Sequence, residues 1–576
     1  MTSQGGPSAV GQTAAGEAVT TAPDSGPAAA DHMAALATGT DSATAQGMPG
    51  TDVGAPATGR EVVVAPRQSY DGGPIWARLL PPLAALALSL WNISIPSYWR
   101  DEAATLAAVK RPFGDLVAML GNVDAVHGAY YIMMWPLAHM FGTGELVMRL
   151  PSALAVAVTA AFVAGIGRRL ASPWVGLAAG LLFAIIPAAS RFGQEARSYA
   201  IVMGIATIAS YLLMRMFTAE PRRRRRWFVG YGASLAVLGI MNIFGLLLIP
   251  AHLVTVALQS RRLRGGKDAR KLAAGWLVAV VAGIAVSSPL LVLGWLQRGQ
   301  IAWLDNARAA TWPGDLNALV ELTGATLVTV VIAAAVVVAL ALSSDTSRAR
   351  RTPWRWRLTE LSLPWIFVPP VLLIGASFFS PIFTSRYVLM CLPAAALLGG
   401  MAVVALGRVV GPVALALALL AGLSNQVGVR APNGHGDNVR VSDKIVRRHM
   451  KPGDVVLYTN PNSQSFSAAY PYGLGKLPDI ALKQAAIPSG TLAGTSVDMK
   501  TLRWRLRHAK RVWVIEINSC VSEPQMMSLS ATPLGPAVHG LPLHFWGIWH
   551  ERNDWLMLYV HGRGSQHAKT ACIGHT

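Results

Sequence analysis

Two adjacent carboxylates open the stretch of sequence that is best equipped for chemistry. Asp101 and Glu102 follow Trp99 on the first loop after an apolar segment long enough to cross a bilayer. Aromatic residues concentrate at membrane–water interfaces, where a carboxylate faces a low dielectric and can gain the basicity that general-base catalysis needs. The alternative is structural, with Asp101 as a helix N-cap and Glu102 in the first helical turn. We predict that both residues are catalytic.

A second polar group follows within one short helical hairpin. Asp124 and His127 precede a tyrosine pair that ends at Tyr131. Facing Asp101 across the loop, they could hold a sugar hydroxyl or a divalent cation. No local ligand spacing requires a metal, so a cation bound by Asp101, Asp124 and His127 is left open, and no other cofactor is expected. The structural alternative for His127 is a side chain that snorkels to the interface.

Two further polar clusters border apolar segments. Gln194 and Arg197 are three residues apart, and Glu195 lies four residues before a tyrosine, so they form polar rows on neighbouring helix faces. Charges beside membrane spans are costly and are more often functional than loop charges. Arg386 opens another apolar segment, where a guanidinium can bind a lipid phosphate in a bidentate manner or simply snorkel. With Asp124, His127 and Tyr131, these side chains are predicted to bind substrate.

The composition indicates a polytopic membrane protein. Only 14% of the 576 residues are charged and the mean hydropathy is +0.41, against roughly 25% charged residues in soluble proteins. The net charge of +20 comes largely from short basic clusters between apolar blocks. Such clusters orient membrane helices, so we predict membrane lipids and no nucleic acid as partners.

The order of apolar blocks predicts about eleven membrane spans. They are 75–95, 146–167, 173–190, 198–217, 227–242, 243–259, 272–294, 320–342, 359–379, 387–407 and 409–425. With a cytoplasmic N-terminus the basic clusters all fall on the inner side, and the tail after residue 430 is extracytoplasmic. Residues 129–142 are apolar but short, and are predicted to form a half-span or an interfacial helix.

Three domains follow from this pattern. Residues 1–70 are rich in small and polar residues and are predicted to be disordered. Residues 71–429 form the membrane domain, with a catalytic first outer loop at 96–128. Residues 430–576 contain strand-like runs at 454–458, 511–515 and 555–560 with helical stretches between them, which predicts a small extracytoplasmic α/β domain. Whether Cys520 and Cys572 form a disulfide is open.

The motifs together resemble the GT-C glycosyltransferases, and within them the bacterial relatives of the protein O-mannosyltransferases. The resemblance spans roughly residues 75–430 and depends on order and spacing. It rests on the motifs Arg-Asp-Glu after the first span, Asp-x-x-His-x-x-Tyr-Tyr, Arg-Leu-Pro-Ser at 149–152, Gln-Glu-Ala-Arg-Ser-Tyr and the late Ser-Arg-Tyr. The family's motif usually reads His-Pro-Pro-x-Tyr-Tyr, whereas Gly128-Ala129 follow His127 here.

The resemblance implies an integral membrane enzyme of the plasma membrane, a glycosyltransferase that uses a polyprenyl-phosphate sugar donor and inverts the anomeric carbon. It implies that Asp101 is the base, that Arg197 and Arg386 steady the phosphate, and that mannose is the sugar, with arabinose, glucose and others open. The acceptor is an extracytoplasmic protein, lipid or glycan. The alternatives are a lipid or sugar transporter or flippase, which would show inverted repeats and mid-span polar residues, and a non-catalytic membrane scaffold.

Overall fold

The structure of the protein is a computed structural model. It describes residues 73–262, 266–301, 321–324, 358–380, 382–516, 541, 543–551, 554–561 and 569–572, together with a few single residues between 329 and 337. The segment predicted to be disordered, 1–70, lies outside these residues. Most of the predicted span 320–342 and Cys520 lie outside them as well.

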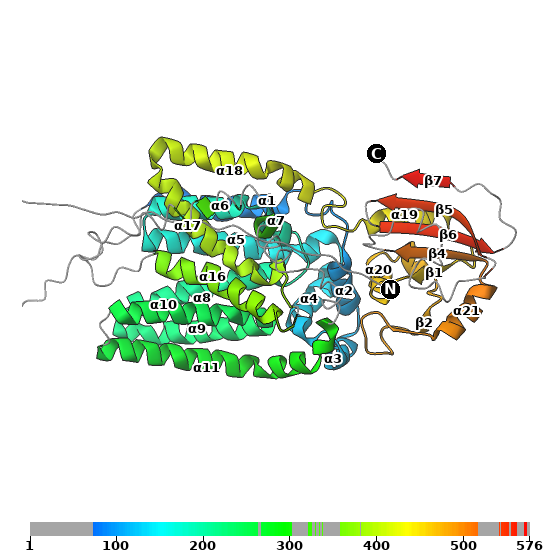
Figure 1. Ribbon diagram of the computed structural model, residues 1–576, viewed down its shortest axis with the longest axis horizontal. Helices are drawn as coiled ribbons and strands as arrows, with labels where there is room; N and C mark the ends of the chain where they lie inside the picture. The colour runs from blue at the N-terminus through cyan, green and yellow to red at the C-terminus, as the bar shows by residue number, and fades with distance from the viewer. Residues whose placement is uncertain are drawn as a thin grey trace, which may run out of the picture. The chain divides into compact units, whose positions relative to one another are not determined.

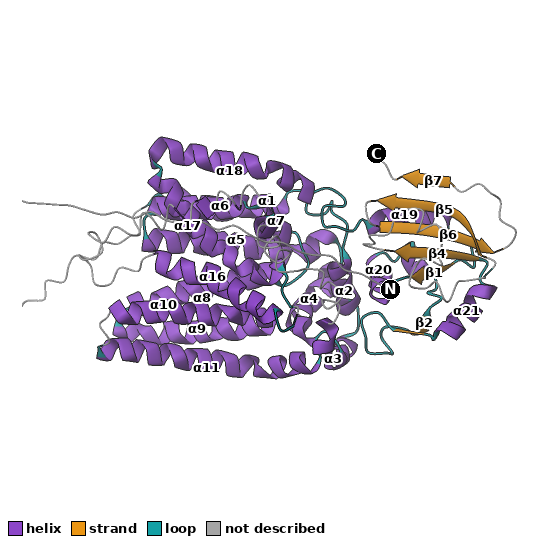
Figure 2. Ribbon diagram, viewed as in Figure 1, coloured by secondary structure: helices purple, strands orange, loops and turns teal. Residues whose placement is uncertain are grey.

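Helices make up most of the described chain up to residue 429 (Figure 1, Figure 2). They are α1 (Trp76–Leu90), α2 (Arg100–Val109), α3 (Phe113–Asn122), α4 (Gly128–Phe141), α5 (Glu145–Leu170), α6 (Pro173–Ile185), α7 (Pro187–Gly193), α8 (Tyr199–Thr218), α9 (Pro221–Met241), α10 (Leu248–Arg262), α11 (Lys267–Leu296), α16 (Leu358–Ser377), α17 (Leu392–Ala405) and α18 (Gly407–Val429). Short 3-10 turns include η1 (Ala125–His127) and η5 (Ser385–Cys391).

Seven of the described helical segments are long and apolar enough to cross a membrane, or eight if the bent pair α6–α7 counts as one span. The protein is therefore a multi-pass membrane protein. Helix α9 covers the predicted span 227–242 but begins with five consecutive arginines, and α1 is shorter than a full span. The predicted number of about eleven spans stays a prediction.

Helix α4 corresponds to the segment predicted as a half-span. Its 14 residues measure about 21 Å at 1.5 Å per residue, less than the hydrocarbon core of about 30 Å. Tyr130, Tyr131 and Met134 on this helix are buried in a cluster that also contains residues of α2 and α3. The length and the burial agree with a helix that packs at the edge of the bundle without crossing it.

Proline fixes the break that brings a polar segment to the site. The axes of α6 and α7 differ by 64° at Ile186–Pro187, because proline removes a backbone donor and cannot continue a helix. The short helix α7 then ends at Gly193, and the chain turns through residues 194–198 before α8 begins. This turn lies against α2, since the backbone N–H of Ala196 donates to Glu102 Oε1 at 2.9 Å.

The C-terminal part contains a five-stranded mixed sheet in the order β1-β4-β6-β5-β7. Its strands are β1 (Val455–Tyr458), β4 (Arg511–Glu516), β5 (Leu543–Glu551), β6 (Asp554–His561) and β7 (Lys569–Cys572), and the helices of this part are α19 (Val439–His449), α20 (Ser465–Ala469) and α21 (Met499–His508). A separate pair, β2 (Leu482–Gln484) and β3 (Thr495–Ser496), completes the region. The predicted strands at 454–458, 511–515 and 555–560 correspond to β1, β4 and β6.

Alternation along the central strands divides the sheet into two apolar faces. Trp513 on β4 and Leu558 on β6 are register partners and belong to the same buried cluster as Tyr98, Leu106 and Tyr130 of the membrane part. The neighbouring positions Val512 and Val514 face a second cluster with α21. One apolar core therefore runs from the short helices α2–α4 into one face of the sheet.

Candidate active site

Glu102 lies at the centre of a closed ion pair. Arg149 of α5 donates from Nε to Glu102 Oε1 at 2.8 Å and from Nη2 to Oε2 at 2.7 Å. Both side chains are 0% exposed, and this bidentate geometry is the strongest that a guanidinium and a carboxylate can form. Although burial opposes ionisation, Arg149 holds the pKa of Glu102 well below its usual range. Glu102 is thus an ionised carboxylate with its oxygens already occupied.

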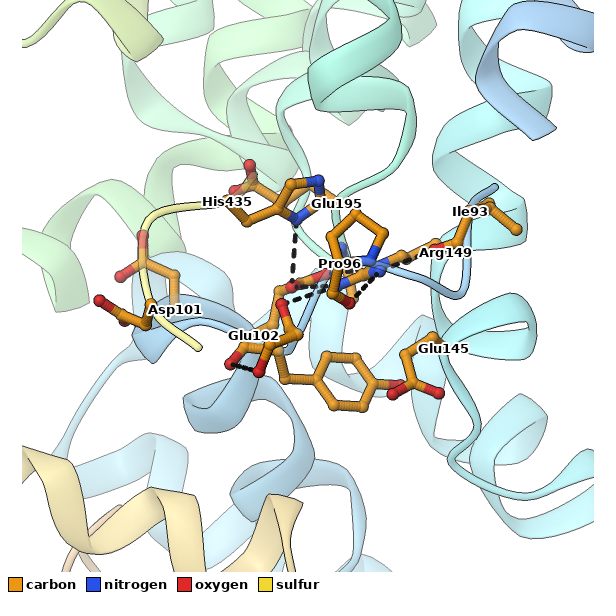
Figure 3. Close-up of polar contacts among 12 residues, drawn as sticks. Ile93, Pro96, Asp101, Glu102, Glu145, Arg149, Glu195 and His435 are labelled. Carbon is orange, nitrogen blue, oxygen red and sulfur yellow. Dashed lines mark hydrogen bonds and ion pairs between the residues drawn. The ribbon is translucent and has the colours of Figure 1, made fainter. Parts of the chain in front are cut away.

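Arg149 also forms hydrogen bonds with the backbone of the loop before α2. Its Nη1 donates to the carbonyl oxygens of Ile93 at 2.7 Å and Pro96 at 3.0 Å, as Figure 3 shows. The guanidinium lies 5.1 Å from the centroid of the Tyr98 ring. A fixed fork of five donors suits this arrangement of carboxylate and carbonyl acceptors. Arg149 therefore ties the first loop and α2 to the membrane helix α5.

Asp101 points away from this ion pair (Figure 3). Its Oδ2 accepts a hydrogen bond from Arg386 Nη1 at 2.7 Å and lies 4.0 Å from Arg197 Nε. The side chain is 23% exposed, so it is the more accessible of the two adjacent carboxylates. Burial raises the pKa of Asp101, but the charges of Arg197 and Arg386 outweigh burial and lower it below the ordinary value.

Arg197 connects Asp101 to the second predicted polar group. Its Nη1 donates to the Tyr131 hydroxyl at 3.0 Å, and that hydroxyl donates to Asp124 Oδ2 at 2.5 Å. Asp124 has φ 62°, a left-handed conformation that aspartate adopts more readily than most residues. A continuous polar chain therefore runs from Asp124 through Tyr131 and Arg197 to Asp101.

His127 completes this group as an acceptor. Arg197 Nη2 lies 2.9 Å from His127 Nε2, and because a guanidinium can only donate, Nε2 must carry no proton. Burial, reinforced by the charge of Arg197, lowers the pKa of His127 to about 4. The imidazole is therefore neutral at physiological pH. The substitution of Gly128-Ala129 for the family's prolines leaves His127 directed at Arg197.

Arg386 lies on the turn η5, far along the chain from the other residues of this group. Its guanidinium lies about 6 Å from the ring centroids of Trp99, Tyr199 and Tyr387, at 6.0, 5.9 and 5.9 Å. Aromatic faces attract cations and displace water around them. The cation is thus held beside Asp101 in a partly dehydrated setting, where an anionic ligand would be bound more strongly than in water.

Gln194 and Glu195 make contacts that mainly anchor the chain. The Gln194 amide donates to the carbonyl oxygens of Ser89 at 3.0 Å and Trp91 at 2.7 Å. Glu195 Oε2 pairs with Arg191 Nη1 at 2.5 Å, while its Oε1 is buried and has no hydrogen-bond partner. Burial, offset only in part by Arg191, raises the pKa of Glu195 to about 7. These contacts favour a structural role for both residues, whose predicted role in substrate binding stays a prediction.

No three His, Cys, Asp or Glu side chains among the described residues converge as metal ligands do. Asp124 and His127, two of the three residues considered for a cation, are instead hydrogen-bonded to Tyr131 and Arg197. The Arg197 guanidinium thus occupies the position between the carboxylates and the imidazole. A divalent cation there would meet a fixed positive charge at close range.

Comparisons with known proteins identify the fold. Residues 128–293 match the family model described as dolichyl-phosphate-mannose-protein mannosyltransferase. Two crystal structures of ArnT from Cupriavidus metallidurans, apo and bound to undecaprenyl phosphate, superpose with a TM-score of 0.55 in each case. They share 13% and 14% identity and cover 84% of this chain and 98% and 99% of their own. The protein has the GT-C fold.

An oligosaccharyltransferase from Archaeoglobus fulgidus gives a weaker match, with a TM-score of 0.47, 11% identity and coverage of 84% of this chain and 72% of its own. The comparison with curated proteins found no match. Within the GT-C fold of this chain, the described residues bring Asp101, Arg197, Tyr131, Asp124, His127 and Arg386 into one cluster.

Three residues of the cluster's surroundings were not predicted from the sequence. Arg149 belongs to the Arg-Leu-Pro-Ser motif but was given no role, and the cost of burying an arginine among apolar residues is the signal that could have revealed its partner. His435 lies with Nδ1 3.6 Å from Glu102 Oε2 and is buried. Asp437 accepts a hydrogen bond from the backbone N–H of Arg100 at 3.0 Å. The last two follow α18 by only a few residues, and no local pattern pointed to them.

Proposed function

We propose that the protein is an integral membrane glycosyltransferase that moves a sugar from a polyprenyl-phosphate donor to an acceptor hydroxyl, with inversion at the anomeric carbon. The observation that carries this proposal is the position of Asp101, a partly exposed carboxylate between two arginines. The GT-C fold and the family match to residues 128–293 support the reaction class.

The ion pair between Asp101 and Arg386 corresponds to the state of the site before a donor binds. In that state the arginines lower the pKa of Asp101 and make it a weak base. A donor phosphate is the stronger partner for a guanidinium, since it offers two oxygens to the fork and carries the charge. Phosphate binding at Arg386 and Arg197 would therefore release the Asp101 carboxylate and raise its basicity at the moment when an acceptor is needed.

The transfer step then needs few groups. The acceptor hydroxyl gives its proton to Asp101 while its oxygen attacks the anomeric carbon, and the bond between that carbon and the phosphate oxygen breaks. The two arginines stabilise the negative charge that develops on the leaving polyprenyl phosphate. Tyr131 and His127 would hold Arg197 in place for this purpose, because both accept hydrogen bonds from it.

Helix α9 supports an extracytoplasmic location for the site. Its first turns carry Arg222 to Arg226, and its last residue, Met241, packs against the cluster around Tyr98 and Tyr131. The helix is about 31 Å long by its rise per residue, close to the thickness of the hydrocarbon core. Because basic clusters remain cytoplasmic, the opposite end of α9, the site and the C-terminal part would lie on the outer side.

A transfer assay tests the proposal directly. Purified protein would be incubated with radiolabelled polyprenyl-phosphate mannose, arabinose or glucose and with extracytoplasmic protein, lipid and glycan fractions. Mannose is tested first, because the matching family model is named for it. The expected result is label transferred from one donor to one fraction.

Asp101→Asn is the matched control, because asparagine preserves shape and hydrogen bonding and loses basicity. General-base contributions are on the order of a hundred- to ten-thousandfold, so transfer should fall at least a hundredfold with donor binding retained. Wild-type transfer by Asp101→Asn would contradict the assignment of the base. Movement of intact donor across vesicles, without cleavage of its phosphate bond, would instead favour a flippase.

A further inference from the structure

Helix α2 carries Asp101 but does not supply its own N-terminal cap. The residue at its N-cap position is Trp99, which makes no side-chain capping hydrogen bond. Asp437 takes that role from a distant part of the chain, since its Oδ2 accepts the backbone N–H of Arg100 at 3.0 Å. The first four N–H groups of a helix need such acceptors. The residue that precedes Asp101 is therefore held by a side chain that follows α18.

The segment around Asp437 is shaped for this contact. Gly436 has φ 109°, a left-handed value that a residue with a Cβ rarely adopts. Two further backbone contacts tie the same region to the start of α2. Ser97 N–H donates to the Pro432 carbonyl oxygen at 2.8 Å, and Tyr98 N–H donates to the Tyr470 hydroxyl at 2.8 Å.

The C-terminal part also holds the other end of α2. Lys110 Nζ donates to the Ala468 carbonyl oxygen at 2.6 Å. Arg111 is 2% exposed, and its guanidinium donates to the carbonyl oxygens of Ala486, Thr491 and Leu492. These contacts come from residues 468–492, whereas the cap comes from residue 437, so α2 is gripped at both ends.

The membrane part provides the remaining supports of α2. They include the ion pair between Glu102 and Arg149, the bond from the Ala196 N–H to Glu102 Oε1 at 2.9 Å and the bond from the Thr105 hydroxyl to the Ala196 carbonyl oxygen at 3.0 Å. The Asp101 carboxylate is held by Arg386 and Arg197, and the Asp101 carbonyl oxygen accepts the Thr105 hydroxyl at 3.3 Å. A displacement of about 1 Å at a reacting group can cost on the order of a hundredfold in rate. The cap on Arg100 therefore bears directly on the Asp101 carboxylate.

We propose that Asp437 is a positioning residue for Asp101: by capping α2 from the segment after α18, it makes the C-terminal domain part of the catalytic machinery. The proposal rests on the function proposed above for Asp101. It adds a catalytic contribution from the domain, because the domain sets the direction in which the base points.

The experiment compares Asp437→Ala with Asp437→Asn in the full-length protein. Asparagine caps a helix about as well as aspartate, and alanine does not. Asp437 Oδ2 also lies 3.8 Å from Arg100 Nε, but the Arg100 side chain is 36% exposed, so loss of this ion pair should matter less than loss of the acceptor oxygen. We expect Asp437→Ala to lower kcat 10- to 100-fold with KM for donor changed less than threefold, and Asp437→Asn to keep kcat within threefold of wild type.

Hydrogen–deuterium exchange gives a readout that does not depend on activity. In Asp437→Ala the N-terminal amides of α2 should exchange at least tenfold faster, and in Asp437→Asn they should exchange as in wild type. The exchange measurement tests the capping role even if no sugar transfer is found. Failure of the proposed function and failure of the capping role can therefore be told apart.

Asp443→Ala is the matched control, because it removes a buried acceptor carboxylate as Asp437→Ala does. Asp443 is buried in the same domain and accepts the backbone N–H groups of Gly473 and Leu474, each at 2.9 Å, without contacting α2. It should leave kcat and α2 exchange unchanged. The proposal is overturned if Asp437→Ala leaves both kcat and exchange at wild-type values. It is also overturned if Asp443→Ala reproduces the losses of Asp437→Ala, because the effect would then be general weakening of the domain.

Discussion

Replacement of Glu102 by glutamine should damage the fold more than the replacement of Asp101 by asparagine. The sequence predicts that Glu102 is catalytic together with Asp101. In the structure it neutralises Arg149, which is buried and has no other anionic partner within hydrogen-bonding distance among the described residues. Glu102→Gln therefore leaves a cation in the interior and turns one acceptor oxygen into a donor.

The loss of stability in Glu102→Gln depends on the contacts that Arg149 retains. Removal of one partner of a buried ion pair costs about 3–5 kcal/mol. Arg149 keeps its bonds to the carbonyl oxygens of Ile93, Pro96 and Ser97, which partly solvate the cation. We therefore expect a loss near the lower end, about 3 kcal/mol. The double variant Glu102→Gln/Arg149→Met should recover about 1–3 kcal/mol relative to the sum of the single changes, since it removes both charges.

Unfolding in detergent, followed by tryptophan fluorescence, measures these differences. Asp101→Asn serves as the comparison, because Asp101 is partly exposed and its change should cost less than about 1 kcal/mol. If Glu102→Gln were as stable as wild type while losing transfer activity, the ion pair would be dispensable to the fold. That result would indicate a catalytic role for Glu102 and would refute the interpretation that Glu102 stabilises the fold by pairing with Arg149.

Three other predictions concern the charges around the site. Arg386→Lys should retain more donor use than Arg386→Ala and less than wild type, because only arginine offers a fork to two phosphate oxygens; equal, undiminished transfer by both variants would refute this. Burial raises the pKa of Glu195 from 4.5 to about 7, so the native state binds a proton that the unfolded chain releases, and stability should fall as pH rises from about 5 to 7. Glu195→Gln should flatten that slope in thermal unfolding measured across pH. Reporter fusions at residue 430 should be active outside the cytoplasm, and cytoplasmic activity would overturn the orientation.

The membrane helices were the part of the fold most accessible to sequence reasoning. Apolar blocks of membrane length give a strong local signal, and the helices α5, α8, α11 and α16 begin and end within a few residues of the predicted spans. Strands such as β4 were also predictable from their apolar runs. The sheet order and its shared core with α2–α4 depend on contacts between distant segments, which no local pattern encodes.

Part of the candidate site could also be predicted from local sequence, and part of it depends on contacts between distant segments. Charged residues at the membrane interface, such as Asp101 and Arg386, were recognisable from the sequence. Placing a charge beside a membrane span costs free energy, so such a residue usually has a function. The sequence predicted the same role for the adjacent residues Asp101 and Glu102. In the structure their contacts differ: Asp101 faces the arginines, and Glu102 is paired with Arg149. Asp437 could not be predicted, because an aspartate beside glycine in a polar loop is typical of any turn.

The grip on both ends of α2 has a consequence for how the protein is made. Residues 100–109 leave the ribosome long before residues 437–492, which hold them, exist. At roughly 5–20 residues per second this interval lasts about 20–80 s. During that time α2 can already be anchored through Arg149, but its cap is missing. Biosynthesis thus inserts a delay between the arrival of Asp101 in the membrane and the completion of its support. Under the function proposed above, a nascent chain would use donor more slowly than the completed protein.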